Sequence, residues 1–256
     1  MTTSQPTTTK HRPLNTQQLQ LLVTLYKFRF TTAQLIASSQ QAKYTRVILA
    51  RLKILVEQEY IGQNYDSSYK IIGKPASYYL LPKGIQVLRK QKFADPKVLN
   101  QIYYDKNKDD VHITHRLNVF KTYVHIKQQY PKQFQFYSKS ELSSWKHIPR
   151  DLTDAYLIRN DGTNSSSETK SSLDARDYFL SYYEANAPFW RTRYSIRRYI
   201  TYAESDKWRT ATKHDFPAVL IACDTKALQR KVQKLTEREL DTAGVSVKFE
   251  FLSVNS

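Results

Sequence analysis

Residues 181–202 read SYYEANAPFWRTRYSIRRYITY and combine an expected strand end with an expected helix. The upstream part, DYFLSYYE over residues 177–184, is apolar and tyrosine-rich, which is typical of a buried strand that ends at Glu184. Pro188 separates this strand from a helix expected over residues 189–204. The stretch therefore predicts a strand, a carboxylate and a cationic helix in direct succession. The cations of that helix are Arg191, Arg193, Arg197 and Arg198.

The composition indicates the class of partner. The chain has 256 residues, with 40 Lys and Arg against 23 Asp and Glu, and a net charge of +17. This positive excess favours a polyanion such as double-stranded DNA as the partner. No stretch approaches the roughly 20 apolar residues that cross a bilayer, so we expect no membrane partner. Cys223 is the single cysteine, which excludes a disulfide framework and favours a cytoplasmic location.

Charge and turn-forming residues divide the chain into parts. Residues 1–12 contain no apolar segment and are expected to be a disordered tail. Residues 13–92 form the first expected domain, and residues 1–90 contain 13 Lys and Arg but 3 Asp and Glu. The charged stretch FADPKVLNQIYYDKNKDD, residues 93–110, is expected to be a linker. Residues 111–256 form the second expected domain.

The first domain has the element order of a winged helix. Asn15 is the expected N-cap of a first helix, RFTTAQLIASS follows as a second, and residues 43–60 form a third. A strand, a long turn, a second strand and a short helix starting at Pro82 come next. This order and the pattern RLKILVEQEYI…KPASYYLLPKGIQVL resemble winged-helix DNA-binding modules.

The third expected helix has one apolar and one cationic face. Cationic side chains that flank small or apolar ones suit a helix lying in a DNA major groove. Lys70 and Lys74, in the long turn, are expected to contact DNA as well. The stripe expected to be buried is Tyr44, Ile48, Leu52, Leu55 and Val56. The opposite, DNA-contacting face is Lys43, Arg46, Val47, Ala50 and Lys53.

The second domain is expected to be an α/β domain with a mixed sheet. Its predicted order is helix, three strands, helix, strand, helix, strand. The fourth strand, FPAVLIAC, is a near-continuous apolar run, as expected for a strand buried on both faces. The order resembles the restriction-endonuclease-like fold. Predicted strands are FQFYS, TDAYLI, DYFLSYYE, FPAVLIAC and VSVKFEFL.

That resemblance implies a metal site on two neighbouring strands. Asp154 at the head of TDAYLI and Glu184 at the end of DYFLSYYE occupy the positions of the two carboxylates that would hold Mg²⁺. Asn186 stands where the fold's catalytic lysine is expected, and Arg197 is the candidate for a migrated positive charge. Two other interpretations stay open: Glu184 pairs with an arginine of the next helix, or Asp154 caps a turn.

The six histidines argue against two other classes of enzyme. A DNA-nicking relaxase needs a tight histidine cluster, and no two histidines here are separated by a single residue. His112 and His115 can share a helix face, but no third ligand is evident, so we expect His115 to pack at the domain junction. Five glycines and no GK[ST] motif argue against ATP use.

Over about Leu14 to Leu252 the chain resembles the replication-relaxation family. The winged helix, HRLNVFKTYV, TDAYLI, YFLSYYEANAP, RRYITY and FPAVLIACDT occur in the family's order. The family implies a bacterial DNA-binding protein of plasmids or mobile elements, with a relaxase or replication protein as partner. Two positions depart from the motifs: Asn186 replaces an Asp, and Thr153 precedes Asp154 in place of Pro.

Three functions are therefore weighed. The first is a DNA-binding accessory or regulatory protein of plasmid or mobile-element replication or mobilisation, with a degenerate nuclease-like domain. The second is a Mg²⁺-dependent endonuclease that uses Asp154 and Glu184. The third is a winged-helix transcription regulator whose C-terminal domain forms a homodimer.

Overall fold

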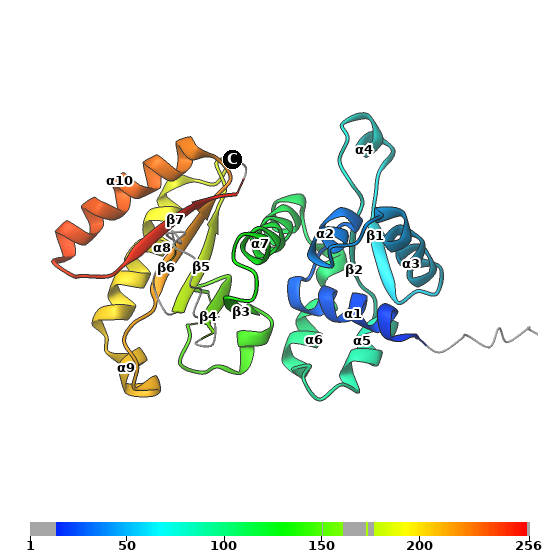
Figure 1. The fold of residues 1–256 in the computed structure, drawn as a ribbon, viewed down its shortest axis with the longest axis horizontal. Helices are drawn as coiled ribbons and strands as arrows, with labels where there is room; N and C mark the ends of the chain where they lie inside the picture. Colours follow the sequence, from blue (N-terminus) through cyan, green and yellow to red (C-terminus); the bar gives the residue numbers. More distant parts are fainter. Residues whose placement is uncertain (1–13, 150, 161–172, 174–176, 255–256) are drawn as a thin grey trace, which may run out of the picture.

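The computed structural model describes residues 14–149, 151–160, 173 and 177–254. Within them it contains ten α-helices, a five-stranded mixed sheet and a two-stranded sheet, which confirms the predicted α/β class (Figure 1). The expected tail lies outside the described residues. No helix of the described part combines the length and apolar character needed to cross a membrane.

The N-terminal part consists of three helices followed by an antiparallel hairpin. Asn15 caps the first helix as predicted, because its side chain accepts from Gln18 N and the Gln18 side chain accepts from Asn15 N. Thr31 adds an antiparallel bridge to Tyr78. The elements are α1 (Thr16–Phe28), α2 (Ala33–Ser39), α3 (Thr45–Glu57), β1 (Ile61–Asn64), α4 (Ser67–Ile71), β2 (Ser77–Leu80) and α5 (Pro82–Arg89).

Helix α3 is buried along most of its predicted stripe. Ile48, Leu52 and Leu55 are buried in the N-terminal core. Tyr44 is an exception, because it lies at the N-cap before the first helical turn and 48% of it is exposed. Its ring instead lies under the charges of Lys43 and Arg46, at 5.3 and 4.9 Å.

Residues 93–110, predicted as a linker, are folded. They contain α6 (Pro96–Ile102) and the 3₁₀ helix η1 (Asp105–Asn107), and Asp95 caps α6 by accepting from Lys97 N. The apolar residues of α6 recur on one helix face and are buried in the N-terminal core. They are Val98, Leu99 and Ile102.

Helix α7 (Asp110–Gln129) lies between the hairpin-bearing part and the large sheet (Figure 1). Phe120 and Val124 belong to the N-terminal core, and the Phe120 ring stacks on Phe28 at 4.1 Å. Val119 and Ile126 pack instead against the sheet. One helix therefore supplies side chains to both hydrophobic cores.

The large sheet has its strands in chain order. The first three are antiparallel neighbours, and the last two add in parallel, each after a helix. The order of the five strands along the chain is the one predicted from the sequence. Every residue of β6 is buried, as its apolar run indicated. The strands are β3 (Phe134–Ser138), β4 (Ala155–Arg159), β5 (Asp177–Tyr183), β6 (Ala218–Cys223) and β7 (Phe249–Ser253).

The two faces of this sheet pack against different helices. Phe179 and Val219 face the core formed with α8 (Phe189–Glu204) and α10 (Lys226–Ala243). Their neighbours Tyr178 and Leu220 face α7, as the alternation of a strand requires. The short helices η2 (Glu141–Ser144) and α9 (Lys207–Thr212) complete the described elements.

Candidate functional site

Asp154 and Glu184 meet on either side of one imidazole. Asp154 directly precedes β4 and Glu184 directly follows β5, and these strands are antiparallel neighbours, so both carboxylates lie at the same end of the sheet. His115, in the second turn of α7, places Nδ1 2.7 Å from Glu184 Oε1 and Nε2 2.9 Å from Asp154 Oδ1. The sequence analysis grouped Asp154 and Glu184 in one site. The structure places the His115 ring between them.

His115 carries a positive charge in this arrangement. Burial lowers its pKa, but the charge of Asp154 and the hydrogen bonds to Asp154 and Glu184 outweigh burial and raise the pKa to about 10. At neutral pH both ring nitrogens are therefore protonated, and each donates a hydrogen bond to one carboxylate. The imidazolium thus connects the start of α7 to the start of β4 and the end of β5.

Asp154 has a second set of cationic and polar neighbours. Its Oδ2 accepts from Tyr182 N at 3.0 Å, and Arg116 Nη1 lies 3.9 Å from its Oδ1. Burial raises the pKa of Asp154, but the charge and hydrogen bond of His115, together with Arg116, hold it well below its usual range. The two carboxylates thus face two cations, and the cluster is close to neutral.

These residues do not fit the predicted Mg²⁺ site. Magnesium takes oxygen ligands, and its charge disfavours neighbouring cations. Here a protonated imidazole fills the space between the two carboxylates, with Arg116 beside it. In the part of the chain that the structure describes, no group of three or more His, Cys, Asp or Glu is placed to hold a metal. Asn186 lies exposed in the turn after β5.

The arginines of α8 bind other partners. Arg197 Nε donates to Glu239 Oε2 at 2.5 Å, and Arg193 Nε donates to Glu239 Oε1 at 2.6 Å. Arg198 Nη1 donates to the Asp151 carbonyl at 2.8 Å. The candidate catalytic Arg197 therefore lies against α10, whereas the partner that the structure gives to Glu184 is His115.

His115 and Arg116 are the ionic partners of Asp154, and the sequence did not reveal them as such. Both lie in HRLNVFKTYV, a stretch that contributes to the family resemblance, but a single sequence does not show which strand end a helix contacts. His112, one turn before Arg116, is different: burial and then the nearby Arg116 lower its pKa to about 4, so it is neutral.

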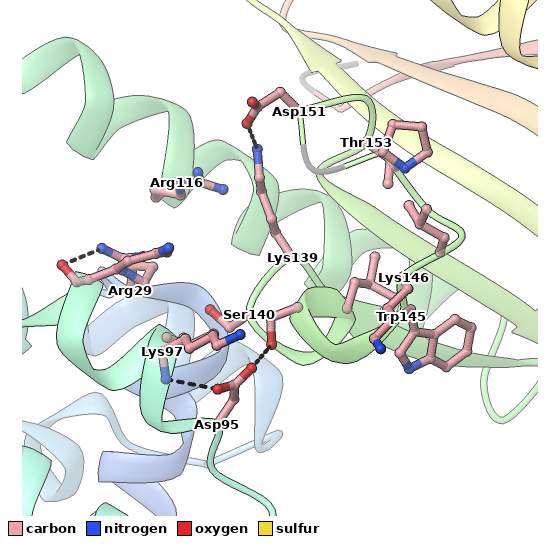
Figure 2. Close-up of a pocket in the computed structure, with 16 residues that line it drawn as sticks. Arg29, Asp95, Lys97, Arg116, Lys139, Ser140, Trp145, Lys146, Asp151 and Thr153 are labelled. Carbon is pink, nitrogen blue, oxygen red and sulfur yellow. Dashed lines mark hydrogen bonds and ion pairs between the residues drawn. The ribbon is translucent and has the colours of Figure 1, made fainter.

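A cationic cavity adjoins the cluster. Its volume is about 510 Å³, and it lies between α6 and the connection from β3 to β4. In Figure 2 the ion pair of Lys139 and Asp151, 3.2 Å long, lies near Arg116. The excess of cations over acids suits an anionic group. The charged residues of the lining are Arg29, Lys97, Arg116, Lys139, Lys146, Asp95 and Asp151.

The predicted DNA-contacting face of α3 is open to solvent. All five of its residues (Lys43, Arg46, Val47, Ala50 and Lys53) are exposed. Lys70 is exposed on α4, at the tip of the hairpin, which extends beyond the other elements of the N-terminal part (Figure 1). Lys74 is engaged instead, since its Nζ lies 2.9 Å from Asp110 Oδ2 at the start of α7.

The sequence pattern described as replication-relaxation matches residues 22–219, from within α1 to within β6. No curated protein and no solved structure matches the chain.

Proposed function

Because the chain belongs to the replication-relaxation family, we propose that it binds duplex DNA as an accessory or regulatory protein in the replication or mobilisation of plasmids or mobile elements. The observation that carries this proposal is the exposed cationic face of α3. A relaxase or replication protein is the partner expected from the family, and a homodimer is compatible with it.

The N-terminal part supports this proposal as a winged helix. Helix α3 packs Ile48, Leu52 and Leu55 into the N-terminal core, and its opposite face therefore points to solvent. On that face Arg46 and Lys53 flank Val47 and Ala50, a combination that suits phosphate contacts beside apolar contacts to base edges. The β1–β2 hairpin serves as the wing, with Lys70 at its tip.

The C-terminal part is proposed as a nuclease-like body without metal chemistry. Its element order resembles the restriction-endonuclease-like fold, but His115 and Arg116 together balance the charge of the two acids that would otherwise attract Mg²⁺. An endonuclease function requires His115 to leave the two carboxylates. A regulator that dimerises through this part is the remaining alternative.

Changing both Arg46 and Lys53 to alanine should weaken duplex binding and reduce its salt dependence. Each lost phosphate contact lowers the slope of log K against log salt by about 0.9, so the expected reduction is about 1.8. The measurement is fluorescence anisotropy of a mixed-sequence duplex over a salt series. Lys90→Ala/Lys92→Ala removes the same charge from exposed positions at the end of α5 and should have a smaller effect. An unchanged affinity and slope in the α3 variant would place the duplex elsewhere.

Supercoiled plasmid should stay intact when incubated with the protein and Mg²⁺ or Mn²⁺. The reason is that a protonated His115 occupies the space between Asp154 and Glu184. Gel electrophoresis with and without EDTA checks this. Nicking that requires metal and disappears in Asp154→Asn would establish the endonuclease alternative, and Asp151→Asn is the matched exposed control.

A further inference from the structure

One face of α8 exposes large aromatic rings among arginines. Trp190 is 65% exposed and Tyr194 is 60% exposed. They are four residues apart, so they lie one above the other, about one helical turn of 5.4 Å along the axis. We call this surface the α8 face; its residues are Trp190, Arg193, Tyr194, Arg197 and Arg198.

The fold itself does not use these two rings. The buried side of α8 is formed by Ile196, Tyr199 and Ile200, which pack against the sheet. Trp190 and Tyr194 lie on the opposite side of the helix. Exposed aromatic side chains of this size are costly to leave in water and mark binding surfaces.

The arginines of the α8 face are held in position from beneath. Glu239 on α10 is only 6% exposed, and its two carboxylate oxygens accept from Arg193 Nε and Arg197 Nε. Among the described residues, no acceptor is assigned to the Nη atoms of Arg193. Arg198 lies over the Tyr194 ring at 5.8 Å, and Arg191 lies over Trp190 at 5.5 Å. Glu239 thus holds the guanidinium groups of Arg193 and Arg197 in position for an external acceptor.

Helix α10 extends the positive charge of the α8 face. It packs beside α8 and exposes five cations, against the exposed acids Glu237 and Asp241. A second copy of this chain, with its net charge of +17, would be repelled by such a surface. A polyanion would be attracted. The five exposed cations of α10 are Lys226, Arg230, Lys231, Lys234 and Arg238.

We propose that the α8 face binds single-stranded DNA. Unpaired bases stack on Trp190 and Tyr194, and the phosphates contact the arginines, which is how stacking surfaces hold single strands. In a duplex the faces of the bases are covered by their neighbours, so the rings cannot reach them. Helix α8 lies in the half of the molecule away from α3 (Figure 1), so its proposed ligand does not depend on the duplex proposed for α3.

The full-length double variant Trp190→Ala/Tyr194→Ala tests this proposal. We expect its affinity for a labelled oligothymidine to fall at least tenfold, since each lost base stack weakens binding by about that factor. Its affinity for the duplex should be unchanged, and Arg46→Ala/Lys53→Ala should show the reverse pattern. Failure of the duplex assignment is therefore distinguishable from failure of the single-strand assignment.

A spectroscopic readout and a matched control complete the test. Oligothymidine should quench tryptophan fluorescence in the wild type; Trp190→Phe should keep the affinity and lose most of the quenching. Tyr103→Ala/Tyr104→Ala removes two exposed aromatic rings beside Lys106. It should leave both the affinity for oligothymidine and the quenching unchanged. The proposal is overturned if the α8 double variant binds oligothymidine as the wild type does, or loses duplex and single strand equally. It is also overturned if the variant only dissociates a dimer in sedimentation.

Discussion

Replacing His115 by alanine should lower the free energy of unfolding by about 3 kcal/mol at pH 6, because it leaves Asp154 and Glu184 facing each other without the cation between them. The two side chains are only 13% and 16% exposed, so water screens their repulsion poorly. Urea denaturation of both proteins measures the difference. His125→Ala, on the same helix, should cost less than about 1 kcal/mol.

The difference between wild type and His115→Ala should depend on pH in a defined way. The pKa of His115 is raised to about 10, so its stabilisation is complete below about pH 6.5, its unfolded value, and is lost as the pH rises toward 10. The pKa of Asp154 is lowered, so its contribution is present above about pH 3.9 and is lost as the pH falls through the folded value. The difference should therefore be largest between about pH 4 and 6.5.

The effect of divalent cations on stability should show whether the His115 imidazolium or a metal ion balances the two carboxylates. Without His115 the two carboxylates lack their cation, so Mn²⁺ should raise the melting temperature of the alanine variant and leave that of the wild type unchanged. A wild-type melting temperature that rises with Mn²⁺, together with no loss of stability in His115→Ala, would mean that the imidazolium is not what balances the acids.

Asp105→Asn should destabilise the fold by about 3–5 kcal/mol, because it leaves Arg29 without its buried counter-charge. Asp105 has no exposed surface; its Oδ2 accepts from Arg29 Nε at 2.7 Å, and its Oδ1 pairs with Arg29 Nη2. Arg29 also donates to the Gln101 carbonyl at 3.2 Å. The change therefore disturbs the contact between the end of α1 and the segment that follows α6.

The pair itself need not add net stability. Burial raises the pKa of Asp105 by more than Arg29 lowers it, so the charged form is not fully compensated. A double variant, Arg29→Met/Asp105→Leu, should therefore recover most of the loss seen in Asp105→Asn. Asp110→Asn breaks an ion pair whose acid is 65% exposed and should cost less than about 1 kcal/mol. A loss no larger for Asp105→Asn than for this control would refute the argument.

Local elements were predictable because their signals are local. The helix expected over residues 189–204 is α8 with the same bounds, and FQFYS is β3. Asn15 caps α1 because its side chain and that of Gln18 are within reach along the chain. Helix α6, within residues 93–110, was not predicted, because the charges and turn-forming residues of this segment outweighed the helical spacing of Val98 and Ile102.

The candidate site was predictable only in part. The pairing of β4 with β5 brings Asp154 and Glu184 to one end of the sheet, and the expected order of the strands along the chain was correct. Which cation they meet depends on how α7 packs, and His115 is 69 residues from Glu184 in sequence. The arginines of α8 were predicted as partners of Glu184 because they are near it in sequence. In the structure Arg193 and Arg197 pair with Glu239 of α10, and no local sequence pattern indicates that contact.

Helix α7 has a mechanical consequence for the whole molecule. Because Phe120 is buried in one core and Val119 packs in the other, neither half can rotate without disrupting the packing of both. Helix α7 thus holds the N-terminal part and the large sheet at a constant separation and angle. DNA held at α3 and a strand held at α8 would be presented with a fixed spacing and relative polarity, which a flexible tether cannot impose.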